Sequence, residues 1–462
     1  MLDRRAFLGA LAAASASGQT SKRVLIAGAG IAGLCCAHEL TRRGYDVTIF
    51  EGRGRPGGRI ETLREGLAPG LTAETGATRI PDTHFHTLAY VREFALPLEP
   101  FHAPPGEDVF HVRGRNLTYQ SGKEPEWPLK LSSEERKLGI AGLNRRYALP
   151  PVAAAKPHAR STHVPPSIAS VDRASLAEYL ARQGLTRDAV ELITLGFDPS
   201  VSAGQMMLIE ASSEVERSYF HIRGGNDQLP YALARRLAGK IQYGCRVLAL
   251  SQDGGQAALT VERDGGERET HRAPHVICTL PFSVTRGLFD GAHLSPAKHK
   301  LITRLPYFAM TKVFLQMREQ FWRKQGQTGF AFTDLLSERF WSLGSAADQR
   351  GLLLSYLIGP NAEQLDMLPD DSDKIRATLD DAERVFPGAR AHFEGARVKS
   401  WASDPWQNGG TVRLAPGELG LLAECGKPEG RIHFAGEHTS RWSGWIQGSL
   451  DSAHRVVREI VG

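Results

Sequence analysis

Near its start the chain changes from an apolar run to glycines and then to apolar positions at helical spacing. Residues 23–27 form a short β-branched and aliphatic run, and the glycine-rich stretch 28–33 follows at once. Apolar residues then recur three and four positions apart until Gly44, and a second apolar run over 45–50 ends at Glu51. This order predicts a strand, a tight turn, a helix and a second strand in one βαβ unit.

The glycines of this turn have the spacing of a dinucleotide-binding site. Gly28 would permit the turn, Gly30 would let the backbone approach a pyrophosphate beside Ala32, and Gly33 would let the helix pack closely on the strand. Glu51 would accept hydrogen bonds from ribose hydroxyls, and its carboxylate would repel a 2′-phosphate, which argues against NADP. The alternative is a glycine-rich βα turn without a ligand.

A second glycine-rich turn follows Glu51 directly. It contains Arg53, Gly58 and Arg59 within residues 53–59. A plain NAD domain does not need such a segment, whereas a cation here suits the diphosphate of a larger cofactor. The pattern favours FAD, with a solvated arginine loop as the alternative.

Composition excludes several classes of protein. The 462 residues are 41% hydrophobic and 23% charged, as in globular proteins, and they suffice for two or three domains. The net charge of +5 is small for this length, and no basic block alternates with aromatics, so a nucleic-acid partner is not expected.

The five cysteines have no metal or disulfide spacing, and adjacent Cys35 and Cys36 suit a helix core. Because no apolar stretch approaches ~18 residues, no membrane span is expected.

The first 20 residues resemble an export signal of the twin-arginine type. Arg4 and Arg5 precede a weakly apolar, alanine-rich run that ends in Ala14-Ser15-Ala16, a pattern typical of a cleavage site. A signal at 1–20 implies a periplasmic or secreted protein that is exported folded. The alternative is a frayed N-terminal helix.

Motifs near the C-terminus extend the pattern. Residues 431–439 indicate a strand that ends in Gly436-Glu437, and residues 442–448 lead into a helix. Together with the N-terminal turns these motifs resemble the flavin-dependent amine oxidases, and among them the L-amino-acid oxidases most. Further segments resemble the family in its own order, at 223–230, 246–248, 276–281, 311–314 and 401–410.

The resemblance implies an α/β fold with two domains. A Rossmann-like FAD-binding domain would be assembled from discontinuous segments, and an α+β substrate domain with a mixed sheet would be built from the rest. The FAD-binding segments would be 21–66, 220–281 and 400–462, and the substrate domain 67–219 and 282–399. Residues 150–167 are rich in proline and alanine and are expected to form a long loop, whereas Ser175 opens a helix with a capping box.

The resemblance also assigns roles to single residues near the flavin. Val247 would meet the adenine through its backbone, Trp401 would contact the cofactor, and Gly436 with Glu437 would contact its ribityl and phosphate region. Amides at Trp445 and Ile446, at a helix start, would stabilise negative charge on the reduced ring. Core packing is the alternative for the tryptophans.

Two further residues carry expectations about the chemistry. Lys312 would approach the flavin N5 through a water molecule, and exposure on an edge strand is the alternative for a lysine in this apolar run. Several family members carry a cysteine that bonds to the flavin after a Gly-Gly pair. Here Thr411 follows Gly409-Gly410, so FAD should be bound non-covalently.

Arg79 favours an amino acid over a simple amine as substrate. In L-amino-acid oxidases an arginine at the matching place binds the substrate carboxylate, and a planar guanidinium suits that group. The alternative is an arginine paired with Glu74 or another acid. A tyrosine that helps to bind the substrate carboxylate in the family is missing near residues 339–344.

His84 would line the pocket entrance, and the His84–His86 pair lacks a third ligand, so no metal is expected.

The expected reaction is FAD-dependent oxidative deamination. Trp445 would form an aromatic wall, a hydride would pass from the substrate Cα to flavin N5, and the imino acid would hydrolyse to a 2-oxo acid and ammonia. O₂ is the expected acceptor, which gives H₂O₂. The alternatives are a monoamine or polyamine oxidase and, from another class, a non-catalytic flavin-binding protein. The state of assembly stays open, with a homodimer as one alternative.

Overall fold

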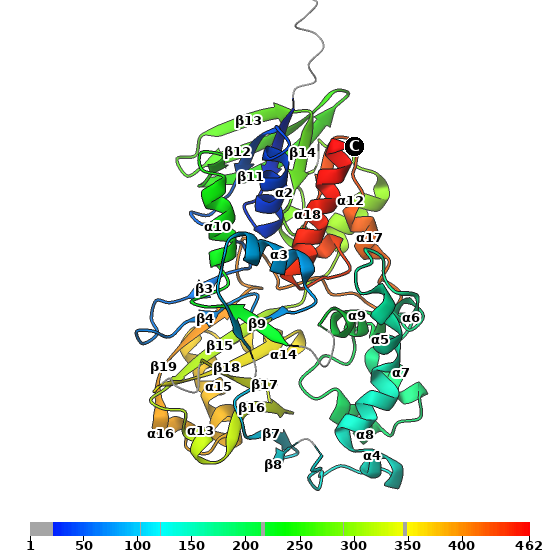
Figure 1. Cartoon of the computed structure of the whole chain (residues 1–462), viewed down its shortest axis with the longest axis vertical. Coiled ribbons are helices and arrows are strands. Elements are labelled where there is room, and N and C mark those ends of the chain that lie inside the picture. Colours follow the sequence, from blue (N-terminus) through cyan, green and yellow to red (C-terminus); the bar gives the residue numbers. More distant parts are fainter. Residues whose placement is uncertain (1–21, 102, 121, 214–217, 290, 345–348) are drawn as a thin grey trace, which may run out of the picture.

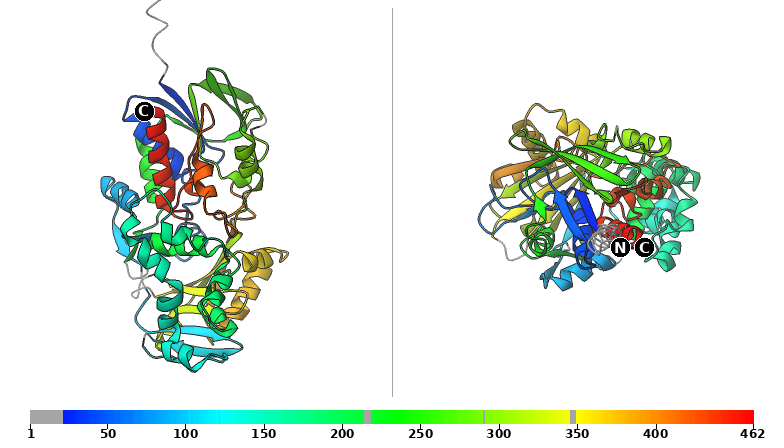
Figure 2. Two further views of the ribbon diagram at one scale, coloured as in Figure 1. Left: turned by 90° about the vertical axis from the view of Figure 1, so that its right-hand side faces the viewer. Right: turned by 90° about the horizontal axis from the view of Figure 1, so that it is seen from above.

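The two largest sheets of the protein lie in different halves of an elongated molecule (Figure 1). This computed structural model describes residues 22–101, 103–120, 122–213, 218–289, 291–344 and 349–462. The upper half in Figure 1 holds a five-stranded sheet with its helices, and the lower half holds a seven-stranded sheet beside a group of short helices. The left view in Figure 2 shows the same division. The fold is mixed α/β, as the sequence predicts.

The five-stranded sheet is wholly parallel, and the βαβ unit predicted at the start of the chain forms its centre. Alternate residues of its central strand point to two different cores: Leu25 and Ala27 to one, Val24 and Ile26 to the other. Burial on both faces explains why these strands are continuously apolar. In spatial order the strands are β10 (Ile241–Gln242), β2 (Asp46–Phe50), β1 (Arg23–Ala27), β14 (His275–Cys278) and β20 (Ile432–Phe434).

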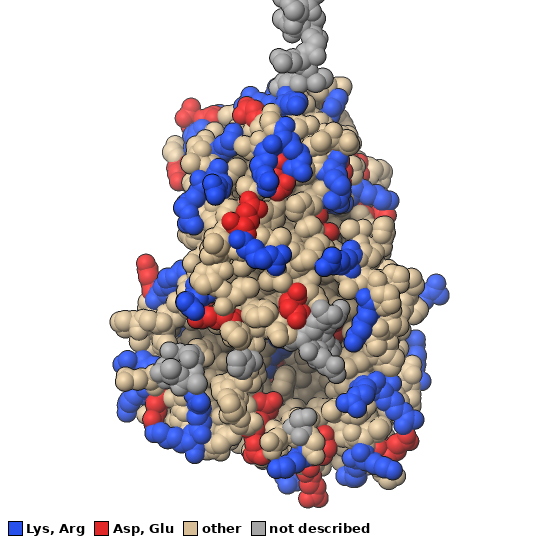
Figure 3. Space-filling model, viewed as in Figure 1, with Lys and Arg blue, Asp and Glu red and all other residues tan. Residues whose placement is uncertain are grey.

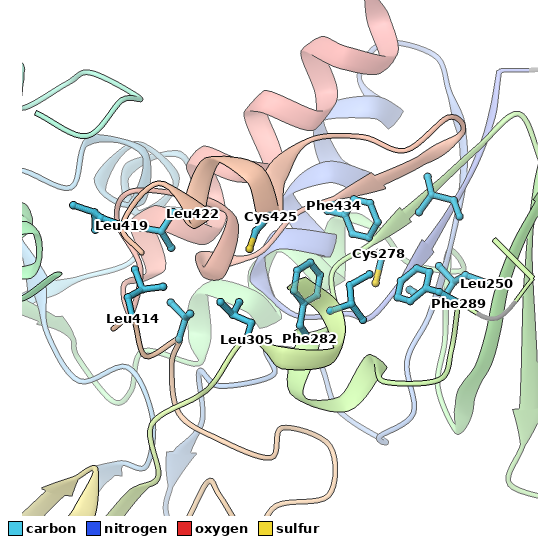
Figure 4. Close-up of a cluster of buried hydrophobic side chains, with 14 of the residues drawn as sticks. Leu250, Cys278, Phe282, Phe289, Leu305, Leu414, Leu419, Leu422, Cys425 and Phe434 are labelled. Atoms are coloured by element: carbon cyan, nitrogen blue, oxygen red, sulfur yellow. The ribbon is translucent and has the colours of Figure 1, made fainter. Parts of the chain in front are cut away.

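Helices cover one face of this sheet and a small antiparallel sheet covers the other. On the first face, α2 (Ile31–Thr41) contacts both α10 (Gln228–Arg236) and α18 (Ile446–Val461). On the second face, Figure 4 shows Cys278, Phe282 and Phe434 in one apolar cluster. The small sheet consists of β11 (Cys245–Asp253), β12 (Gln256–Arg263) and β13 (Arg268–Ala273), and α11 (Phe282–Thr285), α12 (Pro296–Arg304) and α17 (Leu421–Gly426) lie nearby.

The seven-stranded sheet has one face packed on helices. Val313, Leu353 and Phe340 share a core with residues of these helices. The helices are α13 (Phe321–Lys324), α14 (Pro360–Asp366), α15 (Asp371–Val385) and α16 (Ala389–His392). In spatial order the strands are β19 (Phe393–Ser400), β15 (Met310–Met317), β18 (Gly351–Ile358), β17 (Arg339–Leu343), β16 (Gln327–Thr333), β7 (Glu107–Val112) and β8 (Arg115–Tyr119).

The segment 150–167 is helical over much of its length, so the expectation of a long loop there is wrong. Pro150 and Pro151 occupy the first turn of α5, and Pro166 begins α6, where a missing N–H costs nothing. Ser175 caps its helix by the predicted capping box with Glu178. The group comprises α4 (Ser133–Leu143), a π-helix at Asn144–Ala148, α5 (Pro150–Ala155), a 3₁₀ turn at Lys156–His158, α6 (Pro166–Ala169), α7 (Leu176–Arg182), α8 (Arg187–Ile193) and α9 (Ala203–Ser213).

Short elements connect the two halves. They are β3 (Thr62–Leu63), β4 (Ala73–Glu74), β5 (Ile80–Pro81), α3 (Phe85–Glu93), β6 (Leu98–Pro100), β9 (Tyr219–Ile222) and the 3₁₀ turn Glu437–Thr439. All five cysteines are buried and free, and Cys35 and Cys36 lie in the core of α2, as predicted. Among the described residues, no helix combines the length and apolarity that a bilayer span requires. The expected export signal at 1–20 lies outside the described residues, and the expected domain boundaries stay a prediction.

Candidate functional site

A cavity of about 570 Å³ extends from the glycine turn of the five-stranded sheet to the face of the seven-stranded sheet that is not packed on α13–α16. At one end it is lined by Gly28, Gly30 and Glu51, and at the other by Trp341 and Tyr356. The face of the molecule in Figure 3 carries interspersed acidic and basic side chains. Most residues that the sequence assigns to a cofactor or substrate line this cavity: Gly28, Gly30, Ala32, Glu51, Gly58, Arg59, Arg79, Val247, Trp401, Gly436, Glu437, Trp445 and Ile446.

The glycine turn is shaped by close backbone packing. Gly28 has φ +100°, in the region that favours glycine. A Cβ at Gly33 would lie 2.1 Å from the carbonyl oxygen of Gly28, whereas a Cβ at Gly30 would meet no protein atom within 4 Å. Gly33 therefore serves the contact of helix with strand, and Gly30 leaves open space toward the cavity. This is the division of roles that the sequence predicts for the two glycines.

Glu51 is held beside the turn by two backbone amides. Its carboxylate accepts hydrogen bonds from the N–H of Ala29 at 2.7 Å and of Arg53 at 2.9 Å. Burial raises the pKa of Glu51, and the two amides act in the opposite direction. The side chain thus reaches the cavity from a fixed position at the end of β2.

Arg59 and Glu437 form a partly buried ion pair in the cavity wall, with Nη1 and Oε1 2.8 Å apart. Glu437 also accepts hydrogen bonds from the Thr411 hydroxyl at 2.8 Å and the Gly444 amide at 2.9 Å. Burial acts to raise the pKa of Glu437, yet Arg59 and the hydrogen bonds hold it below its ordinary value. A carboxylate fixed in this way keeps its charge, so Arg59 is not a free cation.

Two residues assigned to the cofactor lie outside the cavity lining. The Arg53 guanidinium pairs with Asp404 beside a separate surface depression. Gly33 lies under the turn, as its packing requires. Arg53 therefore reaches the cavity only through its amide on Glu51.

Trp445 immediately precedes α18, whose first residue is Ile446, and it lines the cavity. His84 lies behind it, 1% exposed, with the two ring centroids 5.0 Å apart in an edge contact. His84 Nε2 lies 3.0 Å from the Ser212 carbonyl oxygen, and burial lowers its pKa to about 3. The structure thus corrects the expectation that His84 lines the entrance: it supports Trp445 from behind.

Lys312 lies in β15 between β18 and β19, so the alternative of an exposed edge strand is wrong. The side chain is fully buried, and its ammonium donates to the carbonyl oxygens of Glu74 at 2.9 Å and Gly76 at 2.7 Å and to the Thr78 hydroxyl at 2.7 Å. Burial lowers the pKa of Lys312 to about 7. Because an ammonium has three donors, the expected water-mediated contact has no free donor in this arrangement.

Arg79 projects among aromatic rings at the other end of the cavity. Its guanidinium carbon lies 4.8 Å from the ring centres of Tyr219 and Trp341 and 6.0 Å from that of Trp445. Burial lowers the pKa of Arg79. Within the described ranges no carboxylate forms an ion pair with Arg79, so the alternative of a pair with Glu74 is wrong.

Several lining residues were missed from the sequence. Arg339, Trp341, Tyr356 and Phe332 project from one sheet face, and Glu210 projects from α9. Strand alternation could have placed Arg339 and Trp341 together, but no pattern identified this face as a cavity wall. Glu210 is close enough for its charge to favour the charged form of Arg79, and burial raises the pKa of Glu210.

The described residues contain no cluster of three or more histidine, cysteine, aspartate or glutamate side chains that could hold a metal ion. His84 and His86 diverge: the first lies behind Trp445, and the second stacks on His454 with ring centres 4.3 Å apart. The cavity is therefore suited to an elongated organic cofactor at the glycine end and to a small substrate at the aromatic end.

Comparison with known proteins agrees with this geometry. Residues 31–461 match the family model described as flavin-containing amine oxidoreductase. The chain therefore belongs to this family of flavin-dependent oxidoreductases. A flavin-dependent L-tryptophan oxidase, RebO, from Lentzea aerocolonigenes is 31% identical over 95% of this chain and 98% of its own length. An L-amino-acid oxidase from Vipera ammodytes ammodytes is 26% identical over 95% and 92%.

Solved structures confirm the fold. Putrescine oxidase bound to putrescine has a TM-score of 0.78 and 21% identity, and the match covers 95% of this chain and 98% of that one. Cyclohexylamine oxidase from Brevibacterium oxydans has a TM-score of 0.77 and 23% identity over the same shares. At these identities the match concerns the arrangement of the chain and not the substrate.

Proposed function

We propose that this protein catalyses the FAD-dependent oxidative deamination of L-amino acids to 2-oxo acids and ammonia, with O₂ reduced to H₂O₂. The observation that carries the proposal is Arg79. Its guanidinium faces the cavity among three aromatic rings, and no described carboxylate forms an ion pair with it. A partly buried cation of this kind is stabilised by an anionic ligand, and an amino-acid carboxylate matches its geometry.

The glycine end of the cavity fits FAD. Open space at Gly30 and the start of α2 suit a diphosphate, and Glu51 suits ribose hydroxyls. Thr411 already donates to Glu437 and carries no thiol, which supports non-covalent binding. When bound, the flavin supplies an acceptor for the hydride that leaves the substrate Cα. Acid denaturation should therefore release all yellow colour into the supernatant, and colour retained by the precipitate would contradict non-covalent binding.

The residues of the chain would prepare the substrate for this step. Arg79 would hold the α-carboxylate, and the rings of Trp341 and Trp445 would form the walls around Cα. An aromatic surrounding disfavours the ammonium form, so the substrate amine would lose its proton and expose the nitrogen lone pair. Lys312 would fix the backbone of residues 74–78 beneath the cavity rather than contact the substrate.

The names of the relatives support an amino-acid substrate, since both are amino-acid oxidases. An amine oxidase is the second candidate, because Glu210 lies close to Arg79 and would offset its charge. In that case Arg79 would be a structural cation, and substrates without a carboxylate would be preferred.

We also propose export to the periplasm or exterior on the basis of the arginine pair at the start of the chain.

A peroxide-coupled screen of L-amino acids, D-amino acids and simple amines tests the proposal. We expect turnover of L-amino acids, and Arg79→Met should cost about 2–5 kcal/mol in kcat/KM because the carboxylate loses its charged partner. Arg79→Lys is the matched control, since it keeps the charge without the planar fork and should lose less. Turnover of amines alone, or no effect of Arg79→Met, would contradict the proposal.

A further inference from the structure

A second guanidinium lies at the aromatic end of the cavity, beside that of Arg79. Arg339 lies on β17, two residues before Trp341, so both side chains project from one sheet face about 7 Å apart. The Arg339 side chain is 6% exposed, and its guanidinium carbon lies 4.8 Å from the ring centre of Phe197 and 5.4 Å from that of Tyr356. In the sequence, Arg339 is the first residue of the segment 339–344, in which the tyrosine of the family is missing.

The hydrogen-bonding capacity of Arg339 is largely unused within the described chain. A guanidinium has five N–H donors. The one side-chain hydrogen bond of Arg339 runs from Nη2 to Glu338 Oε2 at 3.2 Å, and its buried Nε has no partner. Nη1 makes no hydrogen bond to a described residue, and the Arg339 side chain lines the cavity, so Nη1 is free to donate to an acceptor on a ligand there.

Glu338, the carboxylate that pairs with Arg339, has a strained backbone conformation. Glu338 has φ +52°, in the left-handed region, and its carboxylate also accepts from the Ile358 amide at 3.3 Å. Burial raises the pKa of Glu338 to about 7, so near neutrality this group offsets only part of the arginine charge. Backbone strain at such a residue persists where the surroundings hold it, which is common at binding sites.

Arg79 and Arg339 stand over neighbouring rings of one surface. Arg79 lies over Trp341, the rings of Trp341 and Tyr356 meet edge-on with centres 5.2 Å apart, and Tyr356 lies beside Arg339. A small molecule that crosses these two rings would reach one guanidinium with each end.

We propose that Arg339 determines substrate specificity by binding an oxygen acceptor on the substrate side chain, and that acidic L-amino acids of glutamate length are preferred. This inference rests on the proposed function, because Arg79 must hold the α-carboxylate. The ring of Tyr356 would cover the methylene groups between the two carboxylates. Glu210 provides the opposing case, since a negative side chain beside Arg79 would favour a cationic substrate such as L-lysine.

The test compares kcat/KM of the holoenzyme for L-glutamate, L-glutamine, L-norleucine and L-lysine. We expect L-glutamate to lead, and we expect Arg339→Met combined with Glu338→Gln to lower the ratio of L-glutamate to L-norleucine by about 10- to 100-fold. The double variant leaves no unpaired charge at this place. Glu338→Gln alone is the matched control, because it keeps the guanidinium and should keep the preference for L-glutamate.

A binding measurement serves if the double variant does not fold. Glutarate has two carboxylates and no amine, so it should perturb the flavin spectrum of the wild-type protein at lower concentration than butyrate does. Equal affinity for the two acids, or a wild-type preference for L-norleucine or L-lysine, would overturn the role of Arg339. Turnover of L-amino acids without acidic preference would overturn this inference alone, whereas no turnover of any L-amino acid would overturn the proposed function itself.

Discussion

The two ends of the cavity are built in different ways. At the glycine end, the shape depends on backbone: an αL turn at Gly28, a close contact at Gly33 and amides that hold Glu51. At the aromatic end, side chains from separate segments make the surface, and Arg79 and Arg339 stand over rings of one sheet face. A backbone-built site changes little when surface residues change, whereas a side-chain site can change its ligand with one substitution.

The largest expected effects compare two glycines of the same turn. Gly33→Val should destabilise the protein by about 3 kcal/mol or more, because its Cβ would overlap the Gly28 carbonyl oxygen. Gly30→Val meets open space and an ordinary φ of −64°, so the apoprotein should fold but bind no flavin. Thermal unfolding and absorbance of the purified proteins measure both effects. Equal stability of the two variants would contradict the separation of packing from ligand space.

The fold can be predicted from the sequence where one local segment sets the geometry. The run 23–51 contains the strand, the turn, the helix and the acidic residue in order, so its fold was predictable, and the family match to residues 31–461 confirms the class of protein. Arg339 and Glu210 could not be placed on the cavity wall, because the wall joins a strand face to a distant helix. The bonds of Lys312 to main-chain oxygens likewise leave no sequence signal.

The dependence of stability on pH tests the protonation state of Lys312, which bonds to the backbone of residues 74–78. The pKa of Lys312 is about 7 in the folded protein, below its ordinary value, so between these values the unfolded chain binds more protons and stability should rise with pH. Glu74, with its pKa raised to about 8 by burial, acts in the opposite sense only below that pH. From pH 8 to 9.5, the free energy of unfolding of the wild-type protein should therefore rise because of Lys312, by at most about 1.4 kcal/mol per pH unit. Lys312→Met should remove this contribution.

Urea unfolding of wild type and Lys312→Met at pH 8 and pH 9.5 measures this difference. The same slope in both proteins would show that Lys312 stays protonated across the range. Its three hydrogen bonds would then outweigh the cost of burial.

The smallest effect is expected outside both ends of the cavity. Ser175→Ala removes the hydroxyl that accepts from the Glu178 amide at the start of α7, and it should cost about 1 kcal/mol of unfolding free energy. Neither residue lines the cavity, so kcat/KM and flavin content should not change. A loss of activity without a loss of stability would mean that the helical group contributes to the site more directly than its packing indicates.

Anaerobic mixing of the flavin-loaded protein with single substrates distinguishes an amino-acid substrate from a simple amine, because it observes electron transfer to the flavin without any assumption about the acceptor. We expect L-amino acids to bleach the flavin absorbance, and D-amino acids and amines without a carboxylate to do so far more slowly. Bleaching by simple amines while L-amino acids leave the spectrum unchanged would contradict a carboxylate site at Arg79.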